Sequence, residues 1–343
     1  MRIGILSSGG DCPGINAAIR GIGKTAITHY NMEVIGLQGG FSGLINKDVI
    51  PLNDNSLSGI LNLGGTILGT SREKPFRKLL EDKTSNKPQA IKDNYKELGL
   101  DCLVCIGGNG TQKTAYSLSE LGLNIISIPK TIDNDVWGTD VTFGFDTAVD
   151  IATEAIDRLH STASSHNRVM VIELMGHDAG WITLHAGMAG GADIILLPEL
   201  GFDIDVITKA VLERVEKGKK YSIIAVAEGI DIEGDKNKVK YKYPASYIAE
   251  KIEELTSIES RETVLGYVQR GGNPSAFDRI LATRLGAHAT ELIKERKFGR
   301  MVCLKNNEIT SISLHKVAGK LKLVEPDNDL IIQGKRIGIS FGK

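Results

Sequence analysis

The stretch that decides the fold is MRIGILSSGGDCPG, residues 1–14. An apolar run (1–6) leads into a glycine-rich turn, and residues 15–27 then carry apolar side chains at helical spacing. This order predicts a strand, a turn and a helix. Glycines let the backbone approach a ligand, and the free N–H groups and positive dipole end of a helix attract phosphate. The alternative is a tight turn with a purely structural role and no ligand.

The same pattern recurs along the chain. Further apolar runs occupy 102–106, 124–128, 169–174, 194–197 and 222–227, and further helical spacing occupies 148–158, 204–216 and 279–295. Apolar strands that alternate with helices predict an α/β fold with mainly parallel sheets covered on both faces. Ligands collect at the carboxyl ends of such strands. The polar stretch 231–242 is expected to form an exposed loop or hairpin.

Composition narrows the class of protein. The chain has 343 residues, which predicts two domains, and its net charge of -1 offers no broad basic surface for nucleic acid. It has no signal-peptide pattern and no run long enough to span a membrane. Four scattered cysteines do not form a disulfide framework, and Cys102 and Cys105 are expected to be buried in a strand. We therefore expect a cytoplasmic protein.

Two more strand ends carry chemical groups. CIGGNGT (105–111) repeats the strand, glycine turn and helix pattern, so two turns suit an extended polyphosphate, whereas dinucleotide and P-loop fingerprints are missing. PKTIDND (129–135) places Asp133 and Asp135 beside Lys130. One carboxylate can accept the proton of an attacking hydroxyl, the second can hold a metal, and the lysine can contact phosphate. The alternative is an Asx-rich turn.

Eight segments in one order carry a resemblance: SGGDCPGINAAIRG, GGTILGTSR, IGGNGT, PKTIDND, FGFDTA, SSHNRVMVIELMG, AVAEG and VLGYVQRGGNPSAFDR. The chain resembles the 6-phosphofructokinase family over nearly its whole length. The resemblance implies two similar three-layer α/β lobes with mainly parallel sheets and an active-site cleft between them. Residues 1–144 plus about 269–308 would form the phosphoryl-donor lobe, and 145–268 plus about 309–343 the sugar-phosphate lobe.

The family's activity is phosphoryl transfer from Mg²⁺-bound ATP to the 1-hydroxyl of fructose 6-phosphate, which gives fructose 1,6-bisphosphate in glycolysis. By resemblance Asp133 is the general base, and Arg72 and Thr131 assist at the transferring group. Asn109 and Asp135 are the expected Mg²⁺ residues. The expected donor-binding residues are Gly10, Arg72, Arg77, Gly108, Gly110, Thr111 and Lys130.

The resemblance also implies a set of acceptor-binding residues, which includes residues of the PKTIDND segment that carries Asp133. Its residues are Thr131, Asp133, Asp135, Arg168, Met175, Gly176, His177, Glu228, Arg261, Tyr267 and Arg270. Arg168 and Arg261 would reach in from a neighbouring subunit, so the resemblance implies a homotetramer or homodimer.

The chain departs from the family pattern at several positions. Asn109 replaces an aspartate, which predicts weaker dependence on Mg²⁺. Gly110 favours ATP because it leaves room for the nucleotide's α-phosphate. Lys130 is typical of pyrophosphate users. We favour ATP because a side chain at position 110 would exclude the nucleotide sterically, whereas a lysine at position 130 can lie beside one. Tyr267 and His177 replace a histidine and a basic residue beside the sugar phosphate.

Three alternatives stay open. The chain can be a pyrophosphate-dependent phosphofructokinase, a kinase of another ketose phosphate such as sedoheptulose 7-phosphate or tagatose 6-phosphate, or a non-catalytic homologue that binds sugar phosphate. Asp133, Arg72 and Thr131 argue against the last, because such a charged site has no structural purpose.

Overall fold

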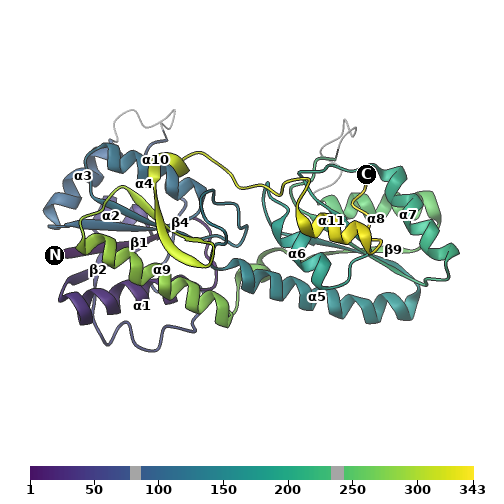
Figure 1. Cartoon of the computed structure of the whole chain (residues 1–343), viewed down its shortest axis with the longest axis horizontal. Helices are drawn as coiled ribbons and strands as arrows, with labels where there is room; N and C mark the ends of the chain where they lie inside the picture. The colour runs from purple at the N-terminus through teal and green to yellow at the C-terminus, as the bar shows by residue number, and fades with distance from the viewer. Residues whose placement is uncertain (78–85, 233–242) are drawn as a thin grey trace. The chain divides into compact units, whose positions relative to one another are not determined.

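The computed structural model describes residues 1–77, 86–232 and 243–343, and the predicted α/β fold with mainly parallel sheets is confirmed (Figure 1). Two compact units divide the chain. Unit 1 comprises 1–131, 135–146 and 270–321, and unit 2 comprises 132–134, 147–269 and 322–343. Most of the loop expected at 231–242 lies outside the described residues.

Unit 1 is built on a seven-stranded sheet with the order β11-β10-β5-β4-β1-β2-β3. Every pairing is parallel except β2 with β3 and β10 with β11 at the two edges. The central strands are almost entirely buried, which explains why their sequences are continuous apolar runs. The strands are β1 (Arg2–Ser8), β2 (Glu33–Leu37), β3 (Val49–Leu52), β4 (Cys102–Gly107), β5 (Ile125–Pro129), β10 (Arg300–Lys305) and β11 (Glu308–Ser313).

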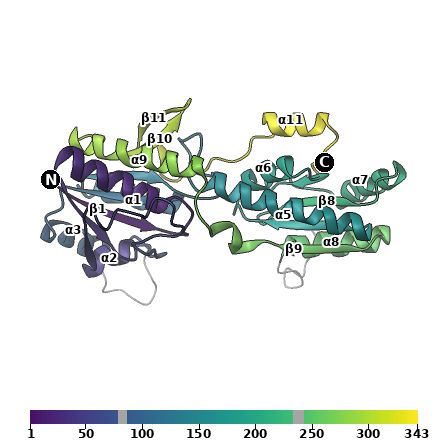
Figure 2. The same ribbon diagram turned by 90° about the horizontal axis from the view of Figure 1, so that it is seen from below.

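Two long helices of unit 1, α1 (Ile15–Lys24) and α9 (Ala276–Lys294), pack side by side (Figures 1 and 2). A Cβ atom at Gly21 would lie 2.7 Å from the carbonyl oxygen of Thr283, so the contact requires a glycine. The helix expected to run to residue 27 changes after α1 into a π-helical turn, η1 (Thr25–His29).

A second group of unit 1 helices shares one apolar core with the sheet. Its members are α2 (Phe41–Asn46), α3 (Lys87–Glu97), α4 (Asn109–Glu120) and α10 (Leu314–Val317). Phe41, Tyr95, Leu118 and Leu314 contribute to this core, and Phe41 is among the largest fully buried side chains. The core holds α4, whose first turn follows β4, against the sheet.

Unit 2 contains a four-stranded, fully parallel sheet with the order β7-β8-β6-β9. Side chains of two helices, α7 (Ile204–Glu216) and α8 (Pro244–Thr256), form an apolar core with β6, β7 and β8. The strands are β6 (Val169–Leu174), β7 (Ile194–Leu196), β8 (Ser222–Ala227) and β9 (Ser260–Val264). The remaining helices are α5 (Phe145–His166), α6 (Trp181–Ala189) and α11 (Asp329–Arg336), and a 3₁₀ turn, η2, covers Gly266–Arg270.

The chain passes between the units in the PKTIDND segment, near residues 146 and 269, and at 321–322. Residues 309–321 group with unit 1 because β11 pairs with β10, whereas the resemblance implied that about 309–343 belong to the other lobe. In the described part of the chain, helices long and apolar enough to cross a membrane are lacking.

Candidate active site

Three strand ends of unit 1 are level with one another. Ser8 at the end of β1 pairs with Gly107 of β4, and Gly107 pairs with Pro129 of β5. Because the strands are parallel, the turns that follow them leave the sheet at the same edge. The structure thus brings the first glycine turn, the start of α4 and the PKTIDND segment together.

The first glycine turn is tied to the segment that carries Arg72. Gly9 donates its N–H to the carbonyl of Ser71 at 3.0 Å, and Thr70 Oγ1 donates to the carbonyl of Gly9 at 2.7 Å. Arg72 follows directly and is exposed, as is Arg77. Because Ser71 is hydrogen-bonded to the turn, Arg72 lies beside it, in a position from which it can reach an anionic ligand.

Lys130 is buried beneath the same turn and supports it. Its ammonium donates to the carbonyl of Ser8 at 3.0 Å and also to the carbonyl of Gly10, and the residue is 2% exposed. The sequence treated Lys130 as a ligand-binding cation that signals pyrophosphate. In the structure its ammonium donates to two backbone carbonyls, and its expected role in donor binding stays a prediction.

Arg270 also lies against this turn. Its Nη1 donates to the carbonyl of Asp11 at 3.2 Å, and a Cβ atom at Gly10 would lie 2.7 Å from Nη1. Gly10 therefore makes room for a guanidinium. Arg270 belongs to unit 1, whereas Arg168 and Arg261, expected at the same sugar phosphate, belong to unit 2.

The start of α4 carries two glycines that a ligand can approach. Gly108 is the residue before the helix, and an added Cβ would make only ordinary contacts there. A Cβ at Gly110 would have no heavy atom within 4 Å. Thr111 is different, because it is buried and its hydroxyl lies 3.5 Å from the carbonyl of Ser8. Its side chain supports the turn.

Asn109 and Asp135 form a direct contact within unit 1. Asn109 Nδ2 donates to Asp135 Oδ2 at 2.5 Å. In the described residues, no group of three or more His, Cys, Asp or Glu side chains is arranged to hold a metal. One carboxylate and one amide suit Mg²⁺, which keeps several waters and takes further oxygens from substrate phosphates.

The predicted base lies where the chain crosses between units. Asp133 belongs to the short unit 2 piece 132–134, while Thr131 and Asp135 belong to unit 1. The carbonyl of Thr131 accepts a hydrogen bond from Thr142 Oγ1 at 2.8 Å, and both threonines are buried. The backbone before the base is therefore fixed to unit 1.

The predicted sugar-binding residues of unit 2 also meet at level strand ends. Leu174 at the end of β6 pairs with Ala227 at the end of β8. Glu228 Oε1 accepts hydrogen bonds from the N–H groups of Gly176 at 3.2 Å and His177 at 2.8 Å. This carboxylate is thereby held in one orientation. Met175 is half-buried beside them.

Gly176 is required by its surroundings, since its φ is +155° and a Cβ would lie 2.4 Å from the carbonyl of Ala179. The His177 ring is exposed, and its Nδ1 lies 3.0 Å from a carboxylate oxygen of Asp178. Tyr267 on η2 is 72% exposed. Both rings are accessible for contact with a ligand or another subunit.

Arg168 and Arg261 meet at one carboxylate. Arg168 Nε lies 2.7 Å from Glu259 Oε2, and Arg261 Nη2 lies 2.6 Å from Glu259 Oε1. The hydrogen bond from Arg168, with the nearby charge of Arg261, holds the pKa of Glu259 below its usual value. The structure thus pairs the two arginines that the resemblance assigned to one phosphate. The sequence reasoning missed Glu259.

A second missed residue is Glu173, a carboxylate inside the apolar strand β6. It is 4% exposed, and its Oε2 accepts the N–H of Ala245 in the first turn of α8 at 3.0 Å. Burial raises its pKa, and the charge of Glu228 adds to the effect. A lone charged residue in the run VMVIEL was the available signal.

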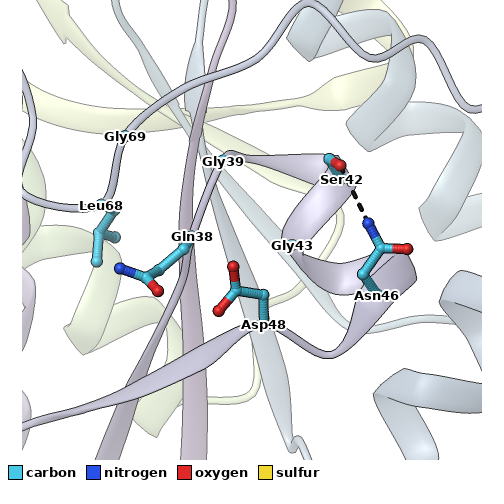
Figure 3. A pocket seen from close by; sticks show the side chains of 8 residues that line it. All are labelled: Gln38, Gly39, Ser42, Gly43, Asn46, Asp48, Leu68 and Gly69. Carbon is cyan, nitrogen blue, oxygen red and sulfur yellow. Dashed lines mark hydrogen bonds between the residues drawn. The ribbon is translucent and has the colours of Figure 1, made fainter.

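Neither the cysteines nor a separate pocket belongs to the predicted site. All four cysteines are free and buried, and burial raises the pKa of the Cys12 thiol to about 12, so it is no nucleophile at neutral pH. Figure 3 shows a pocket of about 380 Å³ beside α2 in unit 1. None of the predicted site residues lines it. Its lining comprises Gln38, Gly39, Ser42, Gly43, Asn46, Asp48, Leu68 and Gly69.

Comparisons with known proteins show the family of the chain. A family model described as Phosphofructokinase matches residues 2–293. The chain is 64% identical to ATP-dependent 6-phosphofructokinase 3 of Bacteroides thetaiotaomicron, with 100% of each chain covered, and 54% identical to ATP-dependent 6-phosphofructokinase of Spirochaeta thermophila, with 99% and 97% covered.

Solved structures are similar as well. Phosphofructokinase from Saccharomyces cerevisiae matches with a TM-score of 0.79 at 30% identity, covering 92% of this chain and 45% of that one. A pyrophosphate-dependent phosphofructokinase from Nitrosospira multiformis matches with a TM-score of 0.85, covering 99% and 88%. At 23% identity, that likeness concerns the fold alone.

Proposed function

The chain belongs to the phosphofructokinase family, and on that premise we propose that it transfers the terminal phosphoryl group of ATP to the 1-hydroxyl of fructose 6-phosphate. The product is fructose 1,6-bisphosphate. Full-length relatives at 46–64% identity bear the name ATP-dependent 6-phosphofructokinase, which supports ATP as the donor.

The observation that carries the choice of donor is Gly110. Among the glycines in the described ranges, it alone combines open space around an added Cβ with a backbone φ outside the positive region. Neither packing nor backbone conformation requires a glycine there, although glycine in a helix costs about 1 kcal/mol relative to alanine. We infer that the missing side chain leaves room for the α-phosphate of a nucleotide.

The remaining donor contacts follow from the edge of the unit 1 sheet. Gly108 and the start of α4 offer backbone N–H groups to the phosphates. Arg72 and Arg77 supply exposed positive charge, and Arg72 neutralises the transferring group because a guanidinium keeps its charge and can grip two oxygens. Gly10, Thr111 and Lys130 act indirectly, because they shape the turn on which the donor binds.

Asp133 is the general base in this proposal. It accepts the proton of the sugar's 1-hydroxyl as that oxygen attacks phosphorus, while Thr131 contacts the transferring group. Asp135 orients the loop. Because phosphoryl transfer leaves little covalent work to the protein, the precision of this loop matters more than the strength of any one contact.

The acceptor binds mainly to unit 2 residues in the proposal, and unit 1 contributes Arg270. Glu228, fixed by two backbone N–H groups, accepts from sugar hydroxyls, and Met175 and Gly176 line the ring. The sugar phosphate is bound by cationic and phenolic groups. These are Arg168, Arg261, Arg270, His177 and Tyr267.

Mg²⁺ is proposed to accompany ATP. Asp135 is the carboxylate that would hold it, with Asn109 contributing its amide oxygen or binding a water of the ion. Bound Mg²⁺ supplies charge neutralisation on the phosphates. The aspartate-to-asparagine change at this turn reduces the protein's share of that charge.

In the proposal the two units bind different substrates, and a neighbouring subunit contributes to the site. We assign the donor to unit 1 and most sugar contacts to unit 2. Arg168 and Arg261 are 28% and 50% exposed at the side chain, so both can serve a neighbouring subunit, and a homodimer or homotetramer in the cytoplasm follows by family likeness.

Parallel assays test the function. Purified protein is given fructose 6-phosphate with MgATP or with Mg-pyrophosphate, and bisphosphate formation is followed against a blank without sugar. We expect turnover with ATP at least tenfold above that with pyrophosphate. Faster turnover with pyrophosphate would overturn the donor assignment, and faster turnover with sedoheptulose 7-phosphate or tagatose 6-phosphate would overturn the acceptor. Sugar-phosphate binding without transfer would overturn both.

A further inference from the structure

Lys322, near the C-terminus, contacts the residue that follows the proposed base. Its Nζ donates to Asn134 Oδ1 at 2.8 Å, and both residues belong to unit 2. Asn134 is 4% exposed. A residue 188 positions away in the sequence therefore holds a buried side chain next to Asp133.

Asn134 has an unusual backbone conformation. Its φ is +52°, in the left-handed region that L-residues other than glycine seldom occupy, although asparagine tolerates it best. Such conformations persist when neighbouring contacts impose them, and they gather at functional sites. Asp133 and Asn134 are joined by one peptide bond, so the backbone conformation of Asn134 bears directly on the placement of Asp133.

Lys322 is itself held in place by unit 2. Its carbonyl accepts the indole N–H of Trp181 at 2.9 Å, and its Nζ lies 5.4 Å from the centre of the Trp181 ring, within the range of a cation–π contact. Two residues on, Val324 donates its N–H to Glu199 Oε1 at 2.9 Å.

Glu199 also contacts the start of helix α6. The same Oε1 accepts the N–H of Gly180, the residue before α6, at 2.9 Å. A Cβ at Gly180 would lie 2.8 Å from Glu199 Oε2, so the carboxylate packs closely on this helix start. The segment 322–324 is thus fixed to α6 on both sides of Leu323, and Lys322 extends from a rigid support.

We propose that Lys322 is a positioning residue for phosphoryl transfer, which fixes Asn134 in its left-handed conformation and thereby aims the carboxylate of Asp133 at the acceptor hydroxyl. The proposal rests on the proposed function, because it assumes that Asp133 is the base. It assigns a role to the C-terminal segment, which lies beyond the family match at residues 2–293.

The main variant is Lys322→Met, which removes the ammonium and keeps the length of the side chain. We expect kcat to fall at least about tenfold with KM for ATP unchanged, because small misplacements of reacting groups cost up to about 100-fold. Lys322→Arg should recover part of the loss. The matched control is Lys320→Met, since Lys320 is an exposed lysine over the ring of Trp137 and should leave kcat within about twofold.

A double-mutant cycle tests the route through Asn134. Glycine accepts positive φ without strain, so in an Asn134→Gly background Lys322→Met should have little further effect on kcat. Additive losses would overturn the proposal, and so would a kcat of Lys322→Met equal to that of Lys320→Met.

Hydrogen exchange gives a readout that does not need activity. Peptides covering 130–137 should exchange faster in Lys322→Met than in wild type, while peptides of β6 should not change. If wild type shows no transfer from either donor, the proposed function fails and exchange decides whether the contact orders the loop. Unchanged exchange in 130–137 would overturn the positioning role even if kcat fell.

Discussion

Asn109 donates its side-chain amide to Asp135 at 2.5 Å. The contact joins the first turn of α4 to the segment that carries the proposed base, and it pairs a neutral donor with a carboxylate. A second carboxylate at position 109 would face Asp135 without a hydrogen to donate, and a cation bound between them would relieve the repulsion.

Asn109→Asp should therefore make the protein more dependent on Mg²⁺. In EDTA we expect a loss of about 1–3 kcal/mol in the free energy of unfolding, because a hydrogen bond to a charged group is replaced by repulsion. Saturating Mg²⁺ should restore most of it, and half-maximal activity should need less Mg²⁺ than in wild type. Urea titrations with and without Mg²⁺ measure this, with exposed Asn46→Asp as control. Equal Mg²⁺ requirements would count against the contact's role.

Gly110→Asp should act on the donor and not on the fold. The site has open space, and an acidic side chain in the first turn of a helix is favourable, so stability should be unchanged or slightly raised. Turnover with ATP should fall at least about 100-fold through steric and charge exclusion, while any turnover with pyrophosphate should persist. Gly110→Ala is the matched variant and should stabilise α4 by up to about 1 kcal/mol. Unimpaired use of ATP by the aspartate variant would refute the inference.

Asp133→Ser should separate binding from chemistry. Loss of a general base costs about 10²–10⁴ in kcat, while the affinity for fructose 6-phosphate should stay within a few-fold. Calorimetry measures the affinity, and steady-state kinetics measures kcat. Asp140→Ser, at an exposed carboxylate paired with Lys305, is the control. A kcat near that of the control would remove Asp133 from the mechanism.

The strands and the turns after them could be predicted because each signal is local. The run at 169–174 became β6 and the helix at 204–216 became α7, with the expected bounds. The start of α4 could also be predicted, because CIGGNGT repeats the local pattern of an apolar strand, a glycine turn and a helix. A parallel sheet also predicts that the turns after these strands share one edge, whereas the register that brings Ser8, Gly107 and Pro129 level is seen only in the structure.

What could not be predicted depends on contacts between distant residues. Lys130 contacts the Gly10 carbonyl 120 positions away, and no property of lysine shows that its charge will be buried against backbone oxygens. The Glu259 that joins Arg168 and Arg261 is also far from Arg168 in the sequence. The roles assigned to site residues by resemblance stay predictions, which the variants here test.

Arg261→Met should weaken binding of the sugar phosphate and little else. Its ion pairs with Glu259 and Glu253 are half-exposed, and such pairs contribute about 0–1 kcal/mol, so unfolding should change little. A lost contact to phosphate costs about 1.5–3 kcal/mol, which raises KM for fructose 6-phosphate about 10- to 150-fold with KM for ATP unchanged. Arg158→Met, at an exposed arginine paired with Glu154, is the control. Identical KM values for the two variants would exclude Arg261 from the site.

Glu173→Gln should stabilise the protein in a pH-dependent way. Burial raises the pKa of this carboxyl in the folded state above its ordinary value of 4.5, so folding favours the protonated form and penalises the charged one. The protonated carboxyl makes its full contribution to the free energy of unfolding at a pH below the pKa of Glu173 in the unfolded chain. That contribution is lost as the pH rises through the pKa of Glu173 in the folded protein. A glutamine oxygen can still accept the N–H of Ala245 and carries no charge.

At pH 7.5 we expect the free energy of unfolding of Glu173→Gln to exceed that of wild type by on the order of 1 kcal/mol, and at pH 4 the two values should converge. Urea unfolding at both pH values measures the difference, with exposed Glu254→Gln on α8 as control. A gain that is the same at both pH values would show that the buried charge is not its cause.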